Sequence, residues 1–539
     1  MKYTPEINYN ADHKIWSGKD EPPYFSTDLS IGEITFHEMQ RHPKLTAQIS
    51  DTENTVLTRE ELFLNSKRVA SYLRNLKLQQ SDIVGIIARN TTHIFAVAYG
   101  CFFNGMAFHS LNINYEQETI EKLFDTTKPK IIFCDGDEYE KVKAATHKLN
   151  VKIVTMRNHK EGSISIEEVL TTPVGENFQP VRLEQGNNQT LAILCSSGTT
   201  AATPKAVTIP NSSILAQIFP FASISDVVYT QSTLDWWTGF LTTISTGIRS
   251  VLRIISDKTF DPIDILRLVK KYKVTCMGQV PAHMAQIVNC PEFEGDCLDS
   301  VLYFFAGGDA CSIEVQQSIR RRLSPKCHFI FGYTFTELGG PGLSNFYFDQ
   351  KPNSVGRLMD GSKLKILNEQ GESVGPNEVG EVCLYTGRYW AGYYGNPEET
   401  RKMRDNNLWY HSGDLGYVDE DGFLFIVDRI NNMLKYKNMK YYPQDIEKVI
   451  TQMPEVSEAC VFGILNPLHG DEAAAAVVKK LGAQLEPQDV IDFVAKHLKA
   501  KYLQLNGGVF IVDDLKRSAN AKTNRRATKD YCLNMPKKN

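Results

Sequence analysis

The chain has 539 residues, too many for one hydrophobic core, so we expect two to four domains. Hydrophobic residues make up 42% and charged residues 23%, as in ordinary globular proteins, and the net charge of −4 indicates no surface for nucleic acid or membrane. The 11 cysteines show no CxxC spacing, which argues for reduced thiols in an intracellular compartment and against a disulfide framework or a zinc site.

We expect no targeting signal at either end of this sequence. Residues 1–16 are polar and of mixed charge, unlike a secretory signal. The longest apolar stretch, 93–108, is too short to span a bilayer. The last residues, 536–539, lack the Ser-Lys-Leu type of peroxisomal signal. We therefore expect a soluble, cytoplasmic protein with no membrane span.

Short β-branched runs alternate with longer helical patterns through the first two thirds of the chain. Strands are expected at 83–88, 130–134, 152–155, 191–195, 301–305 and 328–331. Helices are expected at 91–103 and 138–149. This alternation predicts an α/β fold with parallel sheets covered by helices on both faces.

Polar, glycine-bearing loops follow the strands that end at Cys195, Phe305 and Phe331, where parallel sheets bind their ligands. The loop 196–206 is the most informative, because it holds five hydroxyl side chains, a glycine and a lysine. Small residues let backbone amides reach an anion, and hydroxyls and lysine add donors. The loop therefore fits a polyphosphate, although it lacks the Walker pattern and a plain polar surface loop is the alternative.

The character of the sequence changes near Val355. Glycine-punctuated, alternating segments such as 380–385 predict a smaller β-rich subdomain. After a break near 428–431, a helix at 443–453, strands at 459–463 and 474–478, a helix at 487–498 and a basic tail predict a compact α+β unit.

Five segments, taken in order, resemble the motifs of the adenylate-forming superfamily, which includes acyl-CoA synthetases, coumarate-CoA ligases and beetle luciferases. They are 196–206, 332–337, 409–414, 428–437 and 515–522. The chain is similar over nearly its whole length, and we place it in the insect luciferase-like acyl-CoA synthetase branch. The resemblance implies an AMP-binding domain at 1–428, a hinge at 429–431 and a mobile C-terminal domain at 432–539.

The resemblance also implies roles for particular residues. The phosphates of ATP would be bound by Ser196, Ser197, Gly198, Thr199, Thr200 and Lys205. Adenine and ribose would be bound by Gly307, Gly308, Asp309, Tyr333, Asp414 and Arg429. Thr336 would contact the α-phosphate, Glu337 would hold Mg²⁺, and Lys522 would bridge carboxylate and phosphate. Lys435 and Lys437 would belong to the binding site for CoA.

Each assignment has a structural alternative. Asp414 would also suit a turn, Glu337 a helix cap and Arg429 a surface ion pair. Lys522 lies in a basic run that a solvated tail would also show. Gly307 and Gly308 would suit a strand-to-helix turn that Asp309 caps. Of the pair Trp236 and Trp237, either residue would line an acyl pocket or fill core.

Several family glycines are replaced here, and each replacement restricts φ and adds a Cβ. The replacements are Ala201, Ala206, Thr334, Asn438 and Ala521, and the hinge position is Asn431. The charged candidates nevertheless all remain. We therefore expect an ATP-dependent acyl-CoA synthetase acting on a fatty or other apolar acid, with no indication of oligomeric state. The alternatives are a weakened paralogue that binds nucleotide or acyl ligand, and luciferase-like oxygenation. Family resemblance also raises the peroxisome as a compartment.

Overall fold

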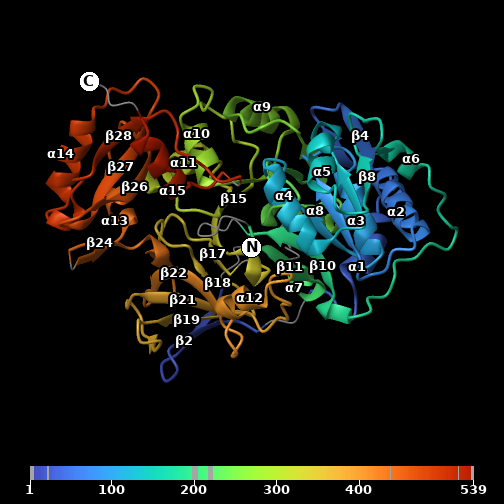
Figure 1. Ribbon diagram of the computed structural model, residues 1–539, viewed down its shortest axis with the longest axis horizontal. Coiled ribbons are helices and arrows are strands. Elements are labelled where there is room, and N and C mark those ends of the chain that lie inside the picture. The colour runs from blue at the N-terminus through green and yellow to red at the C-terminus, as the bar shows by residue number, and fades with distance from the viewer. Residues whose placement is uncertain are drawn as a thin grey trace.

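The computed structural model describes residues 5–20, 24–196, 204–216, 223–340, 342–437, 439–519 and 521–535. The described residues form three large sheets and a smaller C-terminal unit, which lies at one end of the molecule (Figure 1). The predicted α/β fold with a small α+β C-terminal unit is confirmed. Among these residues no helix is both long and apolar enough to cross a membrane.

The first sheet has seven strands in the order β11-β10-β6-β5-β7-β8-β9. Its strands are β5 (Ile83–Ile87), β6 (Ala107–Ser110), β7 (Ile131–Cys134), β8 (Lys152–Thr155), β9 (Ile164–Ser165), β10 (Thr190–Cys195) and β11 (Ala206–Pro210). All pair in parallel except β11, which runs antiparallel to β10. Helices α3 (Ile94–Phe103), α4 (Gln117–Thr127) and α5 (Tyr139–Ala145) connect them. The helix expected at 138–149 is thus shorter than predicted.

The second sheet has nine strands in the order β18-β17-β16-β15-β14-β12-β13-β3-β4. Its parallel strands are β3 (Thr46–Ser50), β12 (Val227–Thr230), β13 (Leu252–Ile255), β14 (Cys276–Gln279), β15 (Tyr303–Gly307) and β16 (His328–Tyr333). Antiparallel edges are formed by β4 (Thr55–Thr58), β17 (Leu343–Asn345) and β18 (Arg357–Leu358). The accompanying helices are α1 (Ile31–Met39), α2 (Arg59–Asn75), α8 (Trp237–Arg249), α9 (Pro262–Tyr272), α10 (Pro281–Val288) and α11 (Ile313–Arg322).

The third sheet is the predicted β-rich subdomain, and its strands pair antiparallel. It contains β19 (Lys363–Leu367), β20 (Ser373–Val374), β21 (Gly380–Tyr385), β22 (Tyr410–Val418) and β23 (Leu424–Arg429). Two strands from the start of the chain, β1 (Ile7–Asn10) and β2 (Ile15–Gly18), complete its edge, as the blue strand beside the orange ones shows (Figure 1). Helix α12 (Pro397–Met403) lies between β21 and β22 in the sequence.

The C-terminal unit packs three helices on a five-stranded sheet. Its strands are β24 (Leu434–Tyr436), β25 (Met439–Tyr441), β26 (Val456–Asn466), β27 (Gly470–Lys479) and β28 (Gly508–Val512), and its helices are α13 (Pro443–Ile450), α14 (Pro487–His497) and α15 (Arg525–Leu533). The prediction of a basic tail is wrong in part, because residues 525–533 form helix α15, which packs against β26. Arg525 of α15 is ion-paired with Glu447 of α13. One of the basic residues that predicted a solvated tail therefore stabilises the packing of α15 instead.

Candidate functional site

The loops after β15 and β16 lie side by side, because these strands pair in parallel with Gly307 opposite Gly332. A Cβ on Gly307 would lie 2.3 Å from the Gly332 carbonyl oxygen, so glycine is required by close strand approach. Asp309 does not cap the following helix. The Ser312 hydroxyl does so, accepting the Val315 N–H, and Asp309 stays exposed at the strand end.

Asp414 lies inside strand β22 rather than in a turn, and only 6% of its surface is exposed. Its Oδ2 accepts a hydrogen bond of 2.6 Å from the Tyr333 hydroxyl, and its Oδ1 lies 2.8 Å from Arg429 Nε. Burial raises the pKa of Asp414, and the Arg429 charge opposes that rise. The partner of Arg429 is therefore a buried carboxylate, not a surface one.

Glu337 follows β16 on a single 3₁₀ turn, η3 (Thr336–Leu338), beside half-buried Thr336. The turn begins after Phe335 with no side-chain cap, so the capping alternative is wrong. Glu337 is 7% exposed, and its Oε1 accepts a hydrogen bond of 2.6 Å from the Tyr393 hydroxyl. The Tyr393 hydroxyl, which comes from the segment before α12, thus fixes one oxygen of the buried Glu337 carboxylate.

Lys205 lies at the entry to β11, and its Nζ is 2.5 Å from Glu399 Oε2 and 5.0 Å from the centre of the Tyr393 ring. Lys205 and Lys402 together lower the pKa of Glu399 to about 2. The Ser196 N–H donates to the Lys205 carbonyl, which brings the two ends of the loop together. The other loop candidates, Ser197, Gly198, Thr199 and Thr200, lie outside the described residues, as does Ala201.

Lys522 reaches the same region from the C-terminal unit. Burial lowers the pKa of Lys522; the charges of Asp309, Asp414 and Glu337 oppose that change, and the Arg429 charge adds to it. The adjacent Thr523 N–H donates to Asp309 Oδ2 at 3.3 Å and joins the two units. The solvated-tail alternative is therefore wrong. Ala521 has a left-handed backbone with φ of 54°, where alanine is strained.

Lys435 on β24 and Lys437 just after it are exposed, and no described contact joins them to this cluster. Asn438 lies outside the described residues. Trp237 is 7% exposed and packs on Phe240 in the core, whereas Trp236 is half-buried. Of the two tryptophans, Trp237 therefore fills core.

Sequence reasoning missed Tyr393 and Glu399, which contact two of the predicted site residues. Their only signal was a glycine-rich turn, 392–397, that enters the acidic start of α12. Neither a phenol nor a second glutamate carries a distinctive pattern in such a turn. Their importance follows from the three-dimensional contacts.

A model of AMP-binding enzymes matches residues 35–394, and one of the C-terminal domain of AMP-binding enzymes matches residues 445–522. The chain belongs to the AMP-binding enzyme family. This confirms the family membership that the five motifs predicted.

Relatives of this AMP-binding enzyme align over nearly their whole length. They include luciferin 4-monooxygenase of Photuris pensylvanica, 28% identical over 94% of this chain and 96% of its own. Another is 4-coumarate:CoA ligase 1 of Petunia hybrida, 25% identical over 97% of both. Two solved structures share the fold. ATP-bound MatB from Rhodopseudomonas palustris has a TM-score of 0.82 at 22% identity, covering 93% of this chain and 99% of that one. The anthranilate CoA ligase AuaEII with anthranoyl-AMP has 0.85 at 18%, covering 94% and 98%.

Replacing Gly307 with alanine is expected to lower the free energy of unfolding by about 1–3 kcal/mol, because β15 and β16 must separate to admit the methyl group. Gly332→Ala is the matched control from the opposite strand. Its Cβ would have no neighbour closer than 3.8 Å, and we expect a change below about 1 kcal/mol. Urea denaturation of the full chain measures both, and equal effects of the two substitutions would contradict this account of the strand contact.

Proposed function

We propose that this AMP-binding enzyme is an ATP-dependent acid–thiol ligase that joins a carboxylic acid to AMP and then transfers the acyl group to CoA. The observation that carries the proposal is that both units of the chain meet at one group of charges. Asp414 is bonded to Tyr333 and Arg429, and the N–H of Thr523, the residue after Lys522, donates to Asp309 across the units. A site for two anionic reactants needs cations that neutralise their repulsion and carboxylates that hold ribose and metal.

In the first step the substrate carboxylate attacks the α-phosphorus of ATP, and pyrophosphate leaves. Lys205 and the loop 196–206 would bind the β- and γ-phosphates, and Thr336 would contact the α-phosphate. Glu337 would hold Mg²⁺, for which carboxylate and phosphate oxygens are suitable ligands. Asp414 would accept hydrogen bonds from the ribose hydroxyls, and Arg429 would donate to the ribose beside it. Gly307, Gly308 and Tyr333 would flank adenine. Lys522 would bridge the attacking carboxylate and the α-phosphate.

In the second step the CoA thiol attacks the acyl carbonyl, and AMP leaves. The proposal requires the part of the chain after the hinge at 429–431 to rotate, which would remove Lys522 from the site and bring Lys435 and Lys437 towards CoA. Exposure of both lysines in the present arrangement supports this change of role.

The acid is proposed to be apolar. We expected a fatty acid from the sequence, whereas related proteins are named for coumarate, benzoate and anthranilate. A panel of fatty and aromatic acids in ATP–pyrophosphate exchange tests both classes. Exchange with at least one acid, followed by CoA thioester formation, is expected. If no acid supports exchange although the protein binds ATP, the proposed ligase activity is overturned.

That failure would favour a second candidate, a protein that binds nucleotide without turnover. One observation favours it: Lys205, the expected phosphate ligand, is already ion-paired with Glu399. Replacement of the loop glycine by Ala201 is consistent with it.

Lys522→Ala is expected to slow adenylation roughly 100- to 1,000-fold, because it removes one charge aimed at the developing transition state. ATP affinity should change little. Lys516→Ala is the control, since Lys516 lies in the same basic run but stacks on Tyr531. Single-turnover adenylation and nucleotide binding separate the effects, and unchanged adenylation in Lys522→Ala would exclude this lysine from the step.

Glu399→Gln is expected to strengthen ATP binding about two- to fivefold, because it frees Lys205 from a partly exposed ion pair. Glu398→Gln is the control. Glu398 precedes Glu399 on the same helix but pairs with Lys402. Calorimetric titration with ATP gives both constants, and the same gain in the two variants would show a general charge effect instead.

A further inference from the structure

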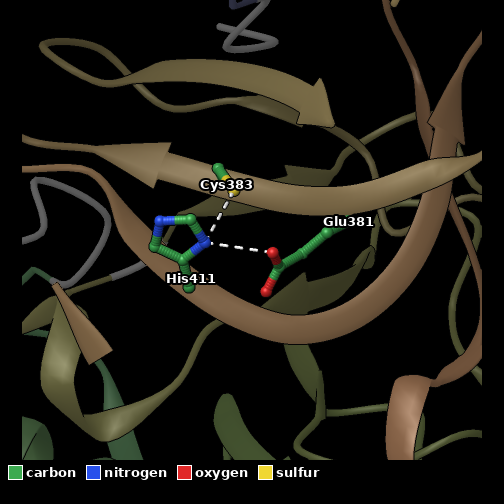
Figure 2. Close-up of side chains that lie close together, drawn as sticks. All are labelled: Glu381, Cys383 and His411. Carbon is green, nitrogen blue, oxygen red and sulfur yellow. Dashed lines mark hydrogen bonds and ion pairs between the residues drawn. The ribbon is translucent and has the colours of Figure 1, made fainter. Parts of the chain in front are cut away.

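A cluster of three ligand-type side chains lies outside the site described above. Glu381 and Cys383 come from β21, and His411 comes from the adjacent strand β22 (Figure 2). Among the described residues this is the one group of at least three such side chains whose ligand atoms all lie within 4.8 Å of one another. Cys383 pairs directly with His411 across the strands, and Glu381, two residues earlier, shares the face of Cys383.

The three ligand atoms converge on one point. His411 Nδ1 lies 3.6 Å from Cys383 Sγ and 3.0 Å from Glu381 Oε2 (Figure 2). In a tetrahedral zinc site with ordinary bond lengths, the nitrogen and sulfur ligands lie about 3.6 Å apart and the nitrogen and oxygen ligands about 3.3 Å apart. The nitrogen–sulfur separation already matches, and the carboxylate needs a small shift to complete the set.

A second layer of hydrogen bonds and one ion pair orients these side chains. Glu381 Oε1 accepts the Gly413 N–H at 3.2 Å, which leaves Oε2 facing the histidine. On the far side of the ring, His411 Nε2 lies 3.6 Å from Asp405 Oδ2. Asp405 is itself fixed, because its Oδ1 accepts the N–H groups of Asn407 and Trp409. A carboxylate behind a ligating histidine is the usual support of a metal site.

Access and donor chemistry also fit an ion. The side chains of Glu381 and His411 are 22% and 28% exposed, which leaves an entry path, while Cys383 is fully buried. Sulfur, imidazole and one carboxylate favour zinc and metals like it over Mg²⁺, which prefers oxygen ligands. The absence of CxxC spacing argued against a zinc site, but these ligands come from paired strands, with Cys383 and His411 28 residues apart.

We propose that Glu381, Cys383 and His411 bind one divalent cation of the zinc class. The bonds formed are to Cys383 Sγ, His411 Nδ1 and a Glu381 carboxylate oxygen. The Cys383 thiol proton is released to solvent, His411 binds as the neutral imidazole through Nδ1 with its proton on Nε2, and no electron is transferred. The bound ion would cross-link β21 to β22 three residues before Asp414. It would therefore make the part of β22 that carries Asp414 more rigid.

Cobalt(II) titration of the metal-free full chain tests the site spectroscopically, since a thiolate–cobalt bond gives charge-transfer absorption in the near ultraviolet. We expect the band to saturate at one equivalent, and Zn²⁺ to displace it. Cys383→Ser should abolish the band, and His411→Gln should weaken cobalt binding at least tenfold. Native mass spectrometry of the unaltered chain with Zn²⁺ should show one bound zinc ion, and this measurement needs no variant to fold.

Two variants provide matched controls. Cys195→Ser removes a thiol that lies 3.6 Å from His109 Nε2, the same separation as in the proposed site, but whose histidine contacts Thr127 on its other nitrogen. His469→Gln removes an imidazole that lies 2.8 Å from Glu472 but has no thiol partner in the described part of the chain. Both should keep the full band. A band that persists in Cys383→Ser, one lost in Cys195→Ser, or no stoichiometric ion in the mass spectrum would each overturn the proposal.

Discussion

The arrangement of the candidate site depends on one buried carboxylate. Asp414 accepts a hydrogen bond from the hydroxyl of Tyr333, which belongs to the second sheet, and pairs with Arg429. Arg429 is the last residue of β23 and the first residue of the proposed hinge. A buried carboxylate is stable as an anion only when such partners satisfy it. The two sheets and the start of the connection to the C-terminal unit therefore meet at a single charge, and the positions of Tyr333 and Arg429 are coupled through it.

Tyr393 likewise connects charged residues of the candidate site. Its hydroxyl donates to Glu337, and its ring lies beneath the Lys205 ammonium, so one side chain contacts both a carboxylate and a lysine of the candidate site. Lys205 itself pairs with Glu399. In the ligase that we propose, Tyr393 would therefore contact both the metal-binding and the phosphate-binding charge.

Much of the fold was predictable because buried parallel strands are continuous apolar runs, as 83–87 and 131–134 are, and such runs stand out from their surroundings. The pairing of β2 with β19 was not predictable, since it joins short, distant segments with little periodicity. At the site, the sequence motifs predicted Asp414, Glu337 and Lys522 as functional residues, and the roles of these residues stay proposals. The contacts of Tyr393, Glu399 and the Glu381–Cys383–His411 cluster depend on tertiary proximity, which local sequence does not encode.

In the ligase that we propose, the backbone of Ala521 would affect the balance between the two arrangements of the C-terminal unit. Its left-handed backbone costs about 1–2 kcal/mol relative to an ordinary conformation, and glycine would avoid most of that cost. The strain exists only while the turn that presents Lys522 keeps this shape. Any arrangement in which the turn relaxes recovers that energy, and about 1.4 kcal/mol changes a population ratio tenfold. In the ligase that we propose, an alanine here would therefore favour any arrangement in which this turn relaxes, and would shorten the time that Lys522 spends in the site.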